Sequence, residues 1–404
     1  MEYMEGKRMK KGMVFVYGIF MFLLAGCAQD SAVDVSGKTD GEFRVYQTLC
    51  MAVDTGDGFY YSDNEGFLKY FDYQAKKESL VCNKPNCRHD SWSESMPQEE
   101  RCDAYVWTSR GFVTGGKLYL LEESFWEDGA GTKLRIVESD LDRTGQREIQ
   151  TLDGGMVTDF AVKDKILYVS VGQSEMMEME GGGWQNSAKC RNKLYRVDLE
   201  EGLAEVLVEK EGFNSDIGIM GAEGDMLYLD FNYFEKEFDG TNFEEAKLHQ
   251  EYYAYSLETK NMAKILQGKA LLPGTGTAIT DGKFYGCMAS GGKTAEEQNT
   301  SDLKKIDLDT GEEELIAHAK NLHMMESCAL YEKTGEMGGF VYDFGQGKEI
   351  AASAMKLDNL YPYCQAGDYL YAALYDEKSQ KYVTGFLALE SLAEGEGGFI
   401  SVGN

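Results

Sequence analysis

The feature that most constrains the fold is a degenerate repeat that runs through the chain. Its first half is a glycine or aspartate turn followed by a short strand with an apolar residue and a tyrosine. Copies stand at Gly58–Tyr61, Gly116–Tyr119, Asp164–Tyr168, Gly224–Tyr228, Asp281–Tyr285 and Gly367–Tyr371. The tyrosines lie about 50 to 60 residues apart as far as Tyr285, a spacing typical of repeats that contain several strands.

The second half of the repeat is a strand that ends near an aspartate, then a polar turn and a short closing strand. Copies begin at Phe67–Asp72, Leu194–Leu199, Tyr253–Leu257 and Leu303–Leu308. Apolar and polar residues alternate in them, which indicates half-buried strands. The turn Asp309-Thr310-Gly311 offers a glycine where a hairpin needs a positive φ. We expect each complete copy to form four short antiparallel strands.

Four strands per unit, repeated radially, predict an all-β fold, a β-propeller of four-stranded blades over residues 43–404. A gap of about 86 residues separates Tyr285 from Tyr371, which leaves room for a degenerate copy. We place that copy around Gly339-Phe340-Val341-Tyr342. The count is then seven blades, with six or eight as alternatives. A β-helix is the competing architecture, but its repeats are much shorter.

The N-terminus predicts export. Lys7, Arg8, Lys10 and Lys11 precede an apolar stretch from Met13 to Leu24, which is too short to span a bilayer. The next residues, Leu24-Ala25-Gly26-Cys27, resemble the lipobox of bacterial lipoproteins. The resemblance implies that residues 1–26 are a signal peptide and that Cys27 is acylated and anchors the protein to a membrane. Residues 27–42 then form a flexible tether. A plain signal or an uncleaved anchor is the alternative.

One cluster of soft metal ligands stands out, formed by Cys82, Cys87, His89 and Cys102. Three thiolates and an imidazole suit tetrahedral Zn²⁺ in a structural site. Export equally favours a disulfide that joins Cys102 to Cys82 or Cys87, and uninvolved thiols are a third possibility. Cys50, Cys287, Cys328 and Cys364 lie in or beside apolar runs, so we expect them to be buried as small hydrophobic residues.

The same segment carries a family resemblance. Leu80–Asp90, followed by Cys102-Asp103-Ala104-Tyr105, resembles the signature of a group of bacterial lipoproteins. Their exported domain is predicted to be a propeller, often compared with the YWTD-like and TolB-like propellers. The YWTD motif itself is absent from this sequence. The resemblance implies an anchored extracytoplasmic propeller and supplies no catalytic residues.

The net charge and the absence of catalytic motifs exclude several classes of function. The chain has a formal net charge of −29, which repels nucleic acid and anionic lipid head groups. We find no Gly-x-Ser-x-Gly elbow, P-loop or His-Glu-x-x-His motif, so we predict no enzyme. Neutral, cationic or metal-bridged ligands remain as binding targets.

The insertions predict where a ligand binds. Long insertions fall between the second and third strands of the repeat, on the face that also receives the Cys82–Cys102 segment. They carry aromatic residues, which offer flat apolar area to sugars, peptides or proteins. We expect ligand binding at Phe125, Trp126, Trp184, Phe234 and Phe238. The alternative is that these rings fold back and cover the blades.

The leading hypothesis is a membrane-anchored binding propeller that captures a glycan, a peptide or an envelope protein outside the cytoplasmic membrane. One alternative is an enzyme, a glycan hydrolase or lyase with carboxylates along the axial channel, because propellers host such chemistry. The other is a purely structural component of the envelope. The sequence leaves open whether the protein faces a periplasm or the outer surface.

Overall fold

The computed structural model describes residues 41–404 with the exception of 48–51, 64, 92–95, 107–109, 125–131, 179–183, 240, 273–274, 290–299, 353–356, 395–398 and 403–404. The predicted signal peptide and Cys27 lie outside the described residues, as do Cys50, Phe125 and Trp126. Among the helices that are described, none is long and apolar enough to cross a bilayer.

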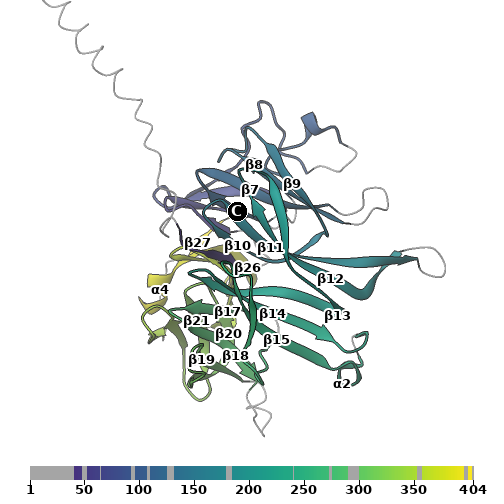
Figure 1. Ribbon diagram of the computed structural model, residues 1–404. Helices are drawn as coiled ribbons and strands as arrows, with labels where there is room; N and C mark the ends of the chain where they lie inside the picture. Colours follow the sequence, from purple (N-terminus) through teal and green to yellow (C-terminus); the bar gives the residue numbers. More distant parts are fainter. Residues whose placement is uncertain are drawn as a thin grey trace, which may run out of the picture. The chain divides into compact units, whose positions relative to one another are not determined.

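Most of the described chain forms antiparallel strands that pair in sequence order, in four-strand runs that we call A to G (Figure 1). Run A is β2 (Ala52–Asp54), β3 (Gly58–Ser62), β4 (Leu68–Asp72) and β5 (Lys77–Leu80). Run B is β6 (Arg110–Thr114), β7 (Lys117–Ser124), β8 (Lys133–Ser139) and β9 (Arg147–Asp153). Run C is β10 (Met156–Lys163), β11 (Ile166–Glu178), β12 (Trp184–Asp198) and β13 (Leu203–Glu223).

Run D is β13, β14 (Met226–Phe234), β15 (Leu248–Ser256) and β16 (Met262–Ile265). Run E is β17 (Thr277–Thr280), β18 (Lys283–Ala289), β19 (Ser301–Asp307) and β20 (Glu313–Met324). Run F is β20, β21 (Cys328–Lys333), β22 (Gly339–Asp343) and β23 (Lys348–Ala352). Run G is β24 (Leu360–Ala366), β25 (Tyr369–Asp376), β26 (Lys381–Ala388) and β27 (Ile400–Ser401). Short elements complete the described chain: β1 (Arg44–Tyr46), α2 (Phe243–Ala246), α4 (Leu389–Glu394), η1 (Gln98–Glu100) and η2 (Leu357–Asn359).

Two long strands each belong to two runs. In β13, residues 203–213 pair with β12 and residues 213–223 pair with β14. In β20, residues 313–319 pair with β19 and residues 319–324 pair with β21. The last strand of one run therefore continues into the first strand of the next, which joins C to D and E to F by continuous backbone.

In most runs the second strand buries both of its faces, because each run is packed between two others, whereas β14 of run D has one buried and one half-buried face. In β7, Leu118 and Leu120 contact run A, whereas Tyr119 and Leu121 contact run C. Successive side chains of a strand point to opposite faces, so an all-apolar strand suits this position. This explains why the repeat keeps consecutive large apolar residues before and after its tyrosine.

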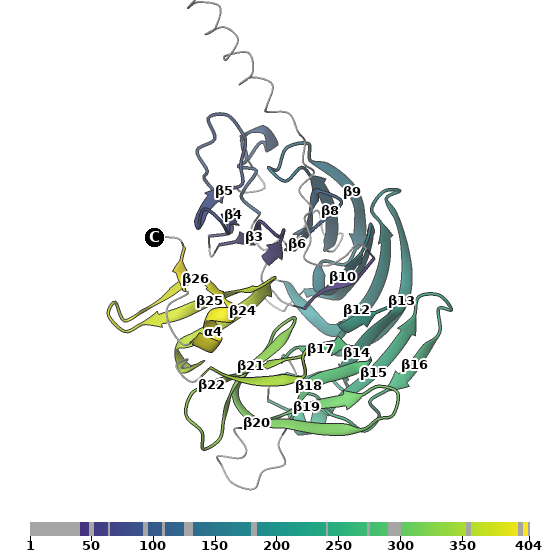
Figure 2. The same ribbon diagram turned by 90° about the vertical axis from the view of Figure 1, so that its left-hand side faces the viewer.

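Every pair of consecutive runs shares a buried hydrophobic cluster, and runs G and A share one as well. In the cluster between G and A, the rings of Phe59 and Phe386 meet edge to face with centroids 4.0 Å apart. Figure 2 shows the last sheet beside the first. The all-β, propeller-like arrangement that the repeat predicts is confirmed.

One copy of the repeat was misplaced. The sequence expectation puts the degenerate first-half strand at Gly339–Tyr342, but these residues lie in β22, the third strand of run F. The second strand is β21, in which Tyr331 is fully buried. The preceding turn, closed by a hydrogen bond from the backbone N–H of Met325 to the carbonyl oxygen of Cys328, contains no glycine. The turn signal of the repeat is therefore missing here.

One predicted loop is a hairpin. The insertion that carries Trp184 is expected to be a loop, but strand pairing between β11 and β12 continues outward to Glu178 and Trp184 (Figure 1). Pairing with the partner strand satisfies backbone groups that a loop would leave to water. Trp184 is thus the first residue of β12.

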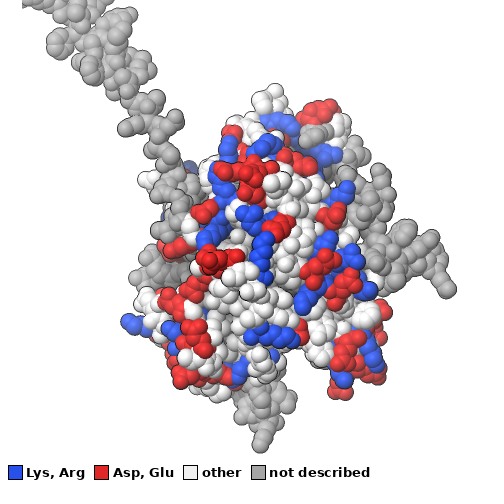
Figure 3. Space-filling model, in the orientation of Figure 1, with Lys and Arg blue, Asp and Glu red and all other residues white. Residues whose placement is uncertain are grey.

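Acidic and basic side chains are interspersed on the face seen in Figure 3. Many of them pair across neighbouring strands, as Arg135 does with Glu148 at 3.1 Å and Arg191 with Glu211 at 2.8 Å. Cross-strand pairs of opposite charge stabilise a sheet modestly. The acidic excess of the chain is therefore not gathered into one patch on this face.

Candidate functional site

The cysteine–histidine cluster lies in the connection from β5 to β6. A backbone hydrogen bond of 3.3 Å from the N–H of Cys87 to the carbonyl of Lys84 closes a turn between the first two cysteines. His89 has a φ of 57°, which turns the chain back toward Cys102. The ammonium of Lys84 donates to the carbonyl oxygen of Arg101 at 2.8 Å and ties the two ends of the connection together.

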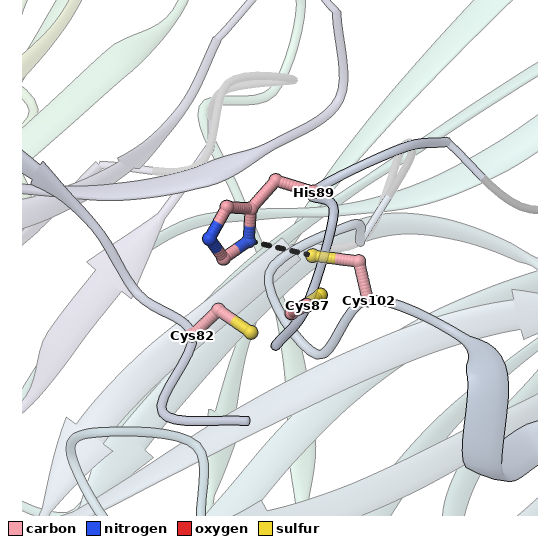
Figure 4. Close-up of side chains that lie close together, drawn as sticks. All are labelled: Cys82, Cys87, His89 and Cys102. Atoms are coloured by element: carbon pink, nitrogen blue, oxygen red, sulfur yellow. Dashed lines mark hydrogen bonds between the residues drawn. The ribbon is translucent and has the colours of Figure 1, made fainter. Parts of the chain in front are cut away.

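These local turns bring the four predicted ligands to one place. One ligand atom from each of Cys82, Cys87, His89 and Cys102 lies within 4.8 Å of all the others. The Nδ1 atom of His89 is 3.6 Å from the sulfur of Cys102, and Figure 4 shows the side chains around a common space. Cys102 is buried, Cys82 and Cys87 are half-buried, and His89 is exposed.

The pKa values of Cys87 and Cys102 are shifted in opposite directions. Burial would raise the pKa of Cys87, but hydrogen bonds from the backbone of His89 and from the thiols of Cys102 and Cys82 outweigh it and lower that pKa. Burial raises the pKa of Cys102 to about 12. All three cysteines are free thiols. Such a donor set can hold a metal ion, which is one of the three roles that the sequence leaves open for these residues, because thiolates and imidazole are the ligands of tetrahedral zinc.

The cluster is anchored to run A by its surroundings. Cys102, Ala104 and Tyr105 are buried together, and Cys82 and Cys87 pack against them. The backbone N–H of Leu68, at the start of β4, donates to the carbonyl of Ala104 at 2.6 Å. Fixing the cluster therefore fixes this connection on the sheet.

Three of the cysteines that the sequence predicts to be buried are described, and they are buried. Cys287, Cys328 and Cys364 are buried, with at most 3% of each exposed. Burial raises the pKa of both Cys287 and Cys328 to about 12, so these thiols are neutral and unreactive.

Of the five predicted aromatic residues, the structure describes the side chains of Phe234 and Phe238. Phe125 and Trp126 are outside it, and of Trp184 only the backbone in β12 is described. Phe234, the last residue of β14, stacks on Phe238 with ring centroids 4.8 Å apart. Of the five predicted residues, Phe234 lines a pocket.

That pocket has a volume of about 490 Å³, within the range of small-molecule sites. Its walls come from the beginnings of β10, β15 and β17, the middle of β13 and the end of β14. In an antiparallel run, the start of the first strand, the end of the second and the start of the third lie at the same end. The pocket thus opens at the end of the runs where the second-to-third connections emerge, the face for which the sequence predicts ligand binding.

Three carboxylates line this pocket, from Asp159 in β10, Asp216 in β13 and Asp230 in β14. The side-chain amide of Asn232 donates to Asp216 at 3.0 Å and to Asp230 at 2.6 Å, and so bridges them. Asp159 accepts a hydrogen bond of 2.9 Å from the backbone N–H of Ile219. The carboxylates thus form a connected group rather than separate surface charges.

Burial is the main cause of the unusual protonation of this group. It raises the pKa of Asp159 to about 7, and the carboxylate of Asp230 adds to the effect while Ile219 and Arg110 oppose it. Burial and the nearby Asp216 raise the pKa of Asp230 to about 6. Burial also raises the pKa of Asp216, against the hydrogen bond from Asn232. Carboxyl groups in a pocket whose pKa values are raised by burial and by neighbouring carboxylates are candidates for a functional site.

Sequence reasoning missed these aspartates, although one signal was available. Two residues after the repeat tyrosine, run B has Leu121 but run D has Asp230, and Asn232 follows on the same face of the strand. Polar residues at consecutive same-face positions of a core strand depart from the repeat. The number of acidic residues in the chain hid this departure.

No protein-family model matches the sequence, and no curated protein matches it. Among solved structures, the propeller domain of the Trilobed protease from Pyrococcus furiosus is 10% identical, with a TM-score of 0.47 over 84% of this chain and 93% of that one. TolB from Acinetobacter baumannii is 12% identical, with a TM-score of 0.36 over 87% and 78%.

Dipeptidyl peptidase 4 from Porphyromonas gingivalis is 9% identical, with a TM-score of 0.42 over 91% of this chain and 56% of that one. At these identities the likenesses say nothing about ligand or activity. The description of the fold rests on the strand registers and the packing clusters given above.

Proposed function

We propose that this chain is a lipid-anchored β-propeller, acylated at Cys27 and held outside the cytoplasmic membrane, that binds a glycan, a peptide or an envelope protein. The pocket between runs C, D and E carries this proposal, because it lies at the end of the runs where the insertions emerge. Its mixture of apolar side chains and a few convergent polar groups is typical of binding sites.

Binding is tested with the full-length protein in detergent on glycan and peptide arrays. Phe234→Ala removes an aromatic wall of the pocket, and Tyr382→Ala is the matched control, since Tyr382 is 60% exposed on β26 and does not line the pocket. We expect an array signal that weakens about tenfold in the first variant and persists in the second. Equal signals in both variants would show that the pocket is not the binding site.

The anchor is tested separately. Cys27→Ser removes the thioether-forming residue, so the variant should leave the membrane fraction and lose the mass of its acyl chains. Unchanged membrane association would favour an uncleaved anchor.

We also propose that runs A to G are the seven blades of the propeller. The support is that each run has four antiparallel strands and that a buried cluster lies between each run and the next, including G and A. An experimental structure with six or eight four-stranded blades would overturn this count.

We further propose that Cys82, Cys87, His89 and Cys102 bind one structural Zn²⁺ ion. In a tetrahedral site with bonds of about 2.0 to 2.3 Å, ligand atoms are about 3.3 to 3.8 Å apart. The 4.8 Å limit on the present separations means that a shift of about 1 Å suffices to close the site. Four protein ligands leave no position for water, so the ion would fix the β5–β6 connection and take no part in a reaction.

Native mass spectrometry of the full-length protein tests the metal. Loss of about 65 Da on chelation is the expected result. A gain of about 2 Da on reduction, without an effect of the chelator, would instead identify a disulfide.

A second candidate is a hydrolase or lyase that acts on glycans. It is favoured by one observation, the proximity of Asp159, whose pKa is raised to about 7, to Asp230 in an open pocket. A pair of neighbouring carboxyl groups in an open site is the arrangement that glycoside hydrolases use. Turnover of a polysaccharide panel that disappears in Asp159→Asn would favour this candidate over simple binding.

A further inference from the structure

The charges that face the pocket are unequal. Asp159, Asp216 and Asp230 line it directly. The nearby cation is Arg110 of β6, whose guanidinium donates 2.6 Å hydrogen bonds to the carbonyl oxygens of Val157 and Thr158. Next to it, the carboxylate of Glu123 in β7 accepts a 3.1 Å hydrogen bond from the N–H of Val157. The described groups therefore carry more negative than positive charge.

The backbone at Gly218 brings two of the carboxylates together. A methyl group placed on this glycine would lie 2.1 Å from Oδ1 of Asp230 and 3.1 Å from Oδ2 of Asp159. Both carboxylates thus flank the same point of β13, and Asn232 connects Asp230 to Asp216 by its two hydrogen bonds. Only a glycine leaves room for this approach. Neighbouring carboxylates in a partly desolvated site repel one another unless a positive group lies among them.

The polar side chains on the remaining walls are neutral. The side-chain amide of Gln47 donates to the carbonyl oxygen of Ile219 at 2.8 Å and to the hydroxyl of Thr277 at 3.2 Å. The amide of Gln250 donates to the side-chain oxygen of Asn232 at 3.3 Å. These amides connect neighbouring strands of the pocket by hydrogen bonds, and they carry no charge that could neutralise the carboxylates.

The cavity and its apolar wall are an observation independent of the charges. Apolar side chains line the pocket from β13, β14, β15 and the segment before β17: Ile219, Met220, Phe234, Leu248, Leu271 and Leu272. A ligand that fills such a space removes apolar surface from water and stabilises the complex by the hydrophobic effect. The site therefore calls for a molecule with an apolar or ring-shaped body.

We propose that the pocket binds small organic amines, with the protonated amino group among Asp159, Asp216 and Asp230 and the apolar body against Phe234 and its neighbours. An ammonium group offers three donors and a positive charge, and charge-assisted hydrogen bonds to carboxylates are the strong ones. This inference rests on the proposed binding function of the pocket and specifies the class of ligand.

The test uses ligand-observed NMR with full-length protein at pH 8 and three probes that share an indole ring and a two-carbon chain: tryptamine, the neutral alcohol tryptophol, and the anion indole-3-propionate. We expect tryptamine to bind at least about tenfold more tightly than tryptophol, and indole-3-propionate not to bind. Asp159→Asn with Asp230→Asn should remove the preference for tryptamine. The control is Asp225→Asn, since the side chain of Asp225 is 70% exposed and lies outside the pocket.

Other outcomes overturn the inference in distinguishable ways. Equal binding of tryptamine and tryptophol, weakened by Phe234→Ala, would keep the pocket as a binding site and discard the amine. Binding of Ca²⁺ that competes with tryptamine and needs the same aspartates would assign the carboxylates to a metal. Absence of tryptamine binding at millimolar concentration would discard the amine, while the array experiment decides independently whether the binding function stands.

Discussion

The side-chain amide of Asn232 lies 2.6 Å from Oδ2 of Asp230 and 3.0 Å from Oδ1 of Asp216, so one neutral group serves two carboxylates from neighbouring strands. This arrangement explains how β13 and β14 can carry acidic side chains into a half-buried pocket. The amide donates to both anions and offsets part of their desolvation.

Asn232→Ala should therefore destabilise the protein. The change leaves Asp216 and Asp230 without their shared donor, so we expect a loss of about 1 to 3 kcal/mol in the free energy of unfolding at pH 8, measured by urea denaturation. Asn261→Ala is the matched control, because Asn261 is exposed and lies outside the pocket. If both variants unfold at the same urea concentration, the bridge contributes nothing.

The raised pKa values predict how stability depends on pH. The folded-state pKa values of Asp159 and Asp230, about 7 and about 6, exceed the value near 4 of an unfolded aspartate. Between about pH 4 and pH 7 the folded state thus binds more protons than the unfolded state, so these groups lower the free energy of unfolding as the pH rises. Each contributes a slope of up to about 1.4 kcal/mol per pH unit.

The measurement is the free energy of unfolding at pH 5, 6 and 7 for the wild type and Asp159→Asn. The variant cannot ionise, so its curve should be flatter, and it should be the more stable protein at pH 7. The groups that face Asp159 are Asp216, Asp230 and Arg110, and the last is charged throughout this range. Parallel curves for the two proteins would show that Asp159 does not titrate in this window.

The fold was more predictable than the pocket, for a physical reason. The tyrosines of the repeat have a packing role that every copy shares, so Tyr119 and Tyr285 could be recognised from their neighbours alone. The copy at Tyr331 escaped because its preceding turn has no glycine. The alternation of apolar and polar residues in a strand indicates which face is buried. It therefore predicts the packing that all copies of the repeat share.

The site depended on contacts that no local pattern contains. Asp159 and Asp230 are 71 positions apart in the numbering and meet only because β10 and β14 flank the same stretch of β13. The cysteine cluster was predictable because its ligands lie within one connection of the chain and its chemistry is read from residue type. In contrast, an aspartate in a chain with 69 acidic residues carries no signal until its burial is known.

The metal proposal predicts a specific effect of losing one ligand. Cys87→Ser should reduce the zinc content, measured by elemental analysis, from about one ion per chain to a small fraction, because serine is a poor zinc ligand. Cys190→Ser is the control, since Cys190 is a half-buried free thiol outside the cluster. Zinc retained in Cys87→Ser, or lost equally in both variants, would exclude the proposed site.

We expect the ring of runs A to G to open first at the interface between G and A. Runs C and D share β13, runs E and F share β20, and the other consecutive runs follow one another along the chain, whereas among the described residues G and A have neither a shared strand nor a connecting segment and are held by side-chain contacts. Phe386 is fully buried there, with its ring 4.0 Å from that of Phe59. Phe386→Ala should cost about 3 to 5 kcal/mol of unfolding free energy by leaving a cavity.

Hydrogen exchange shows which strands lose stability in Phe386→Ala. In Phe386→Ala, the backbone amides of β3 and β25 should exchange faster at low denaturant than those of β13, because the ring opens where neither a shared strand nor the chain itself joins two runs. Phe340→Ala is the control, since Phe340 is also buried but lies between runs E and F, which β20 connects. It should destabilise the protein without selective exchange in β3. Uniform exchange across all runs in Phe386→Ala would mean that the ring unfolds as one unit and that a shared strand gives no local protection.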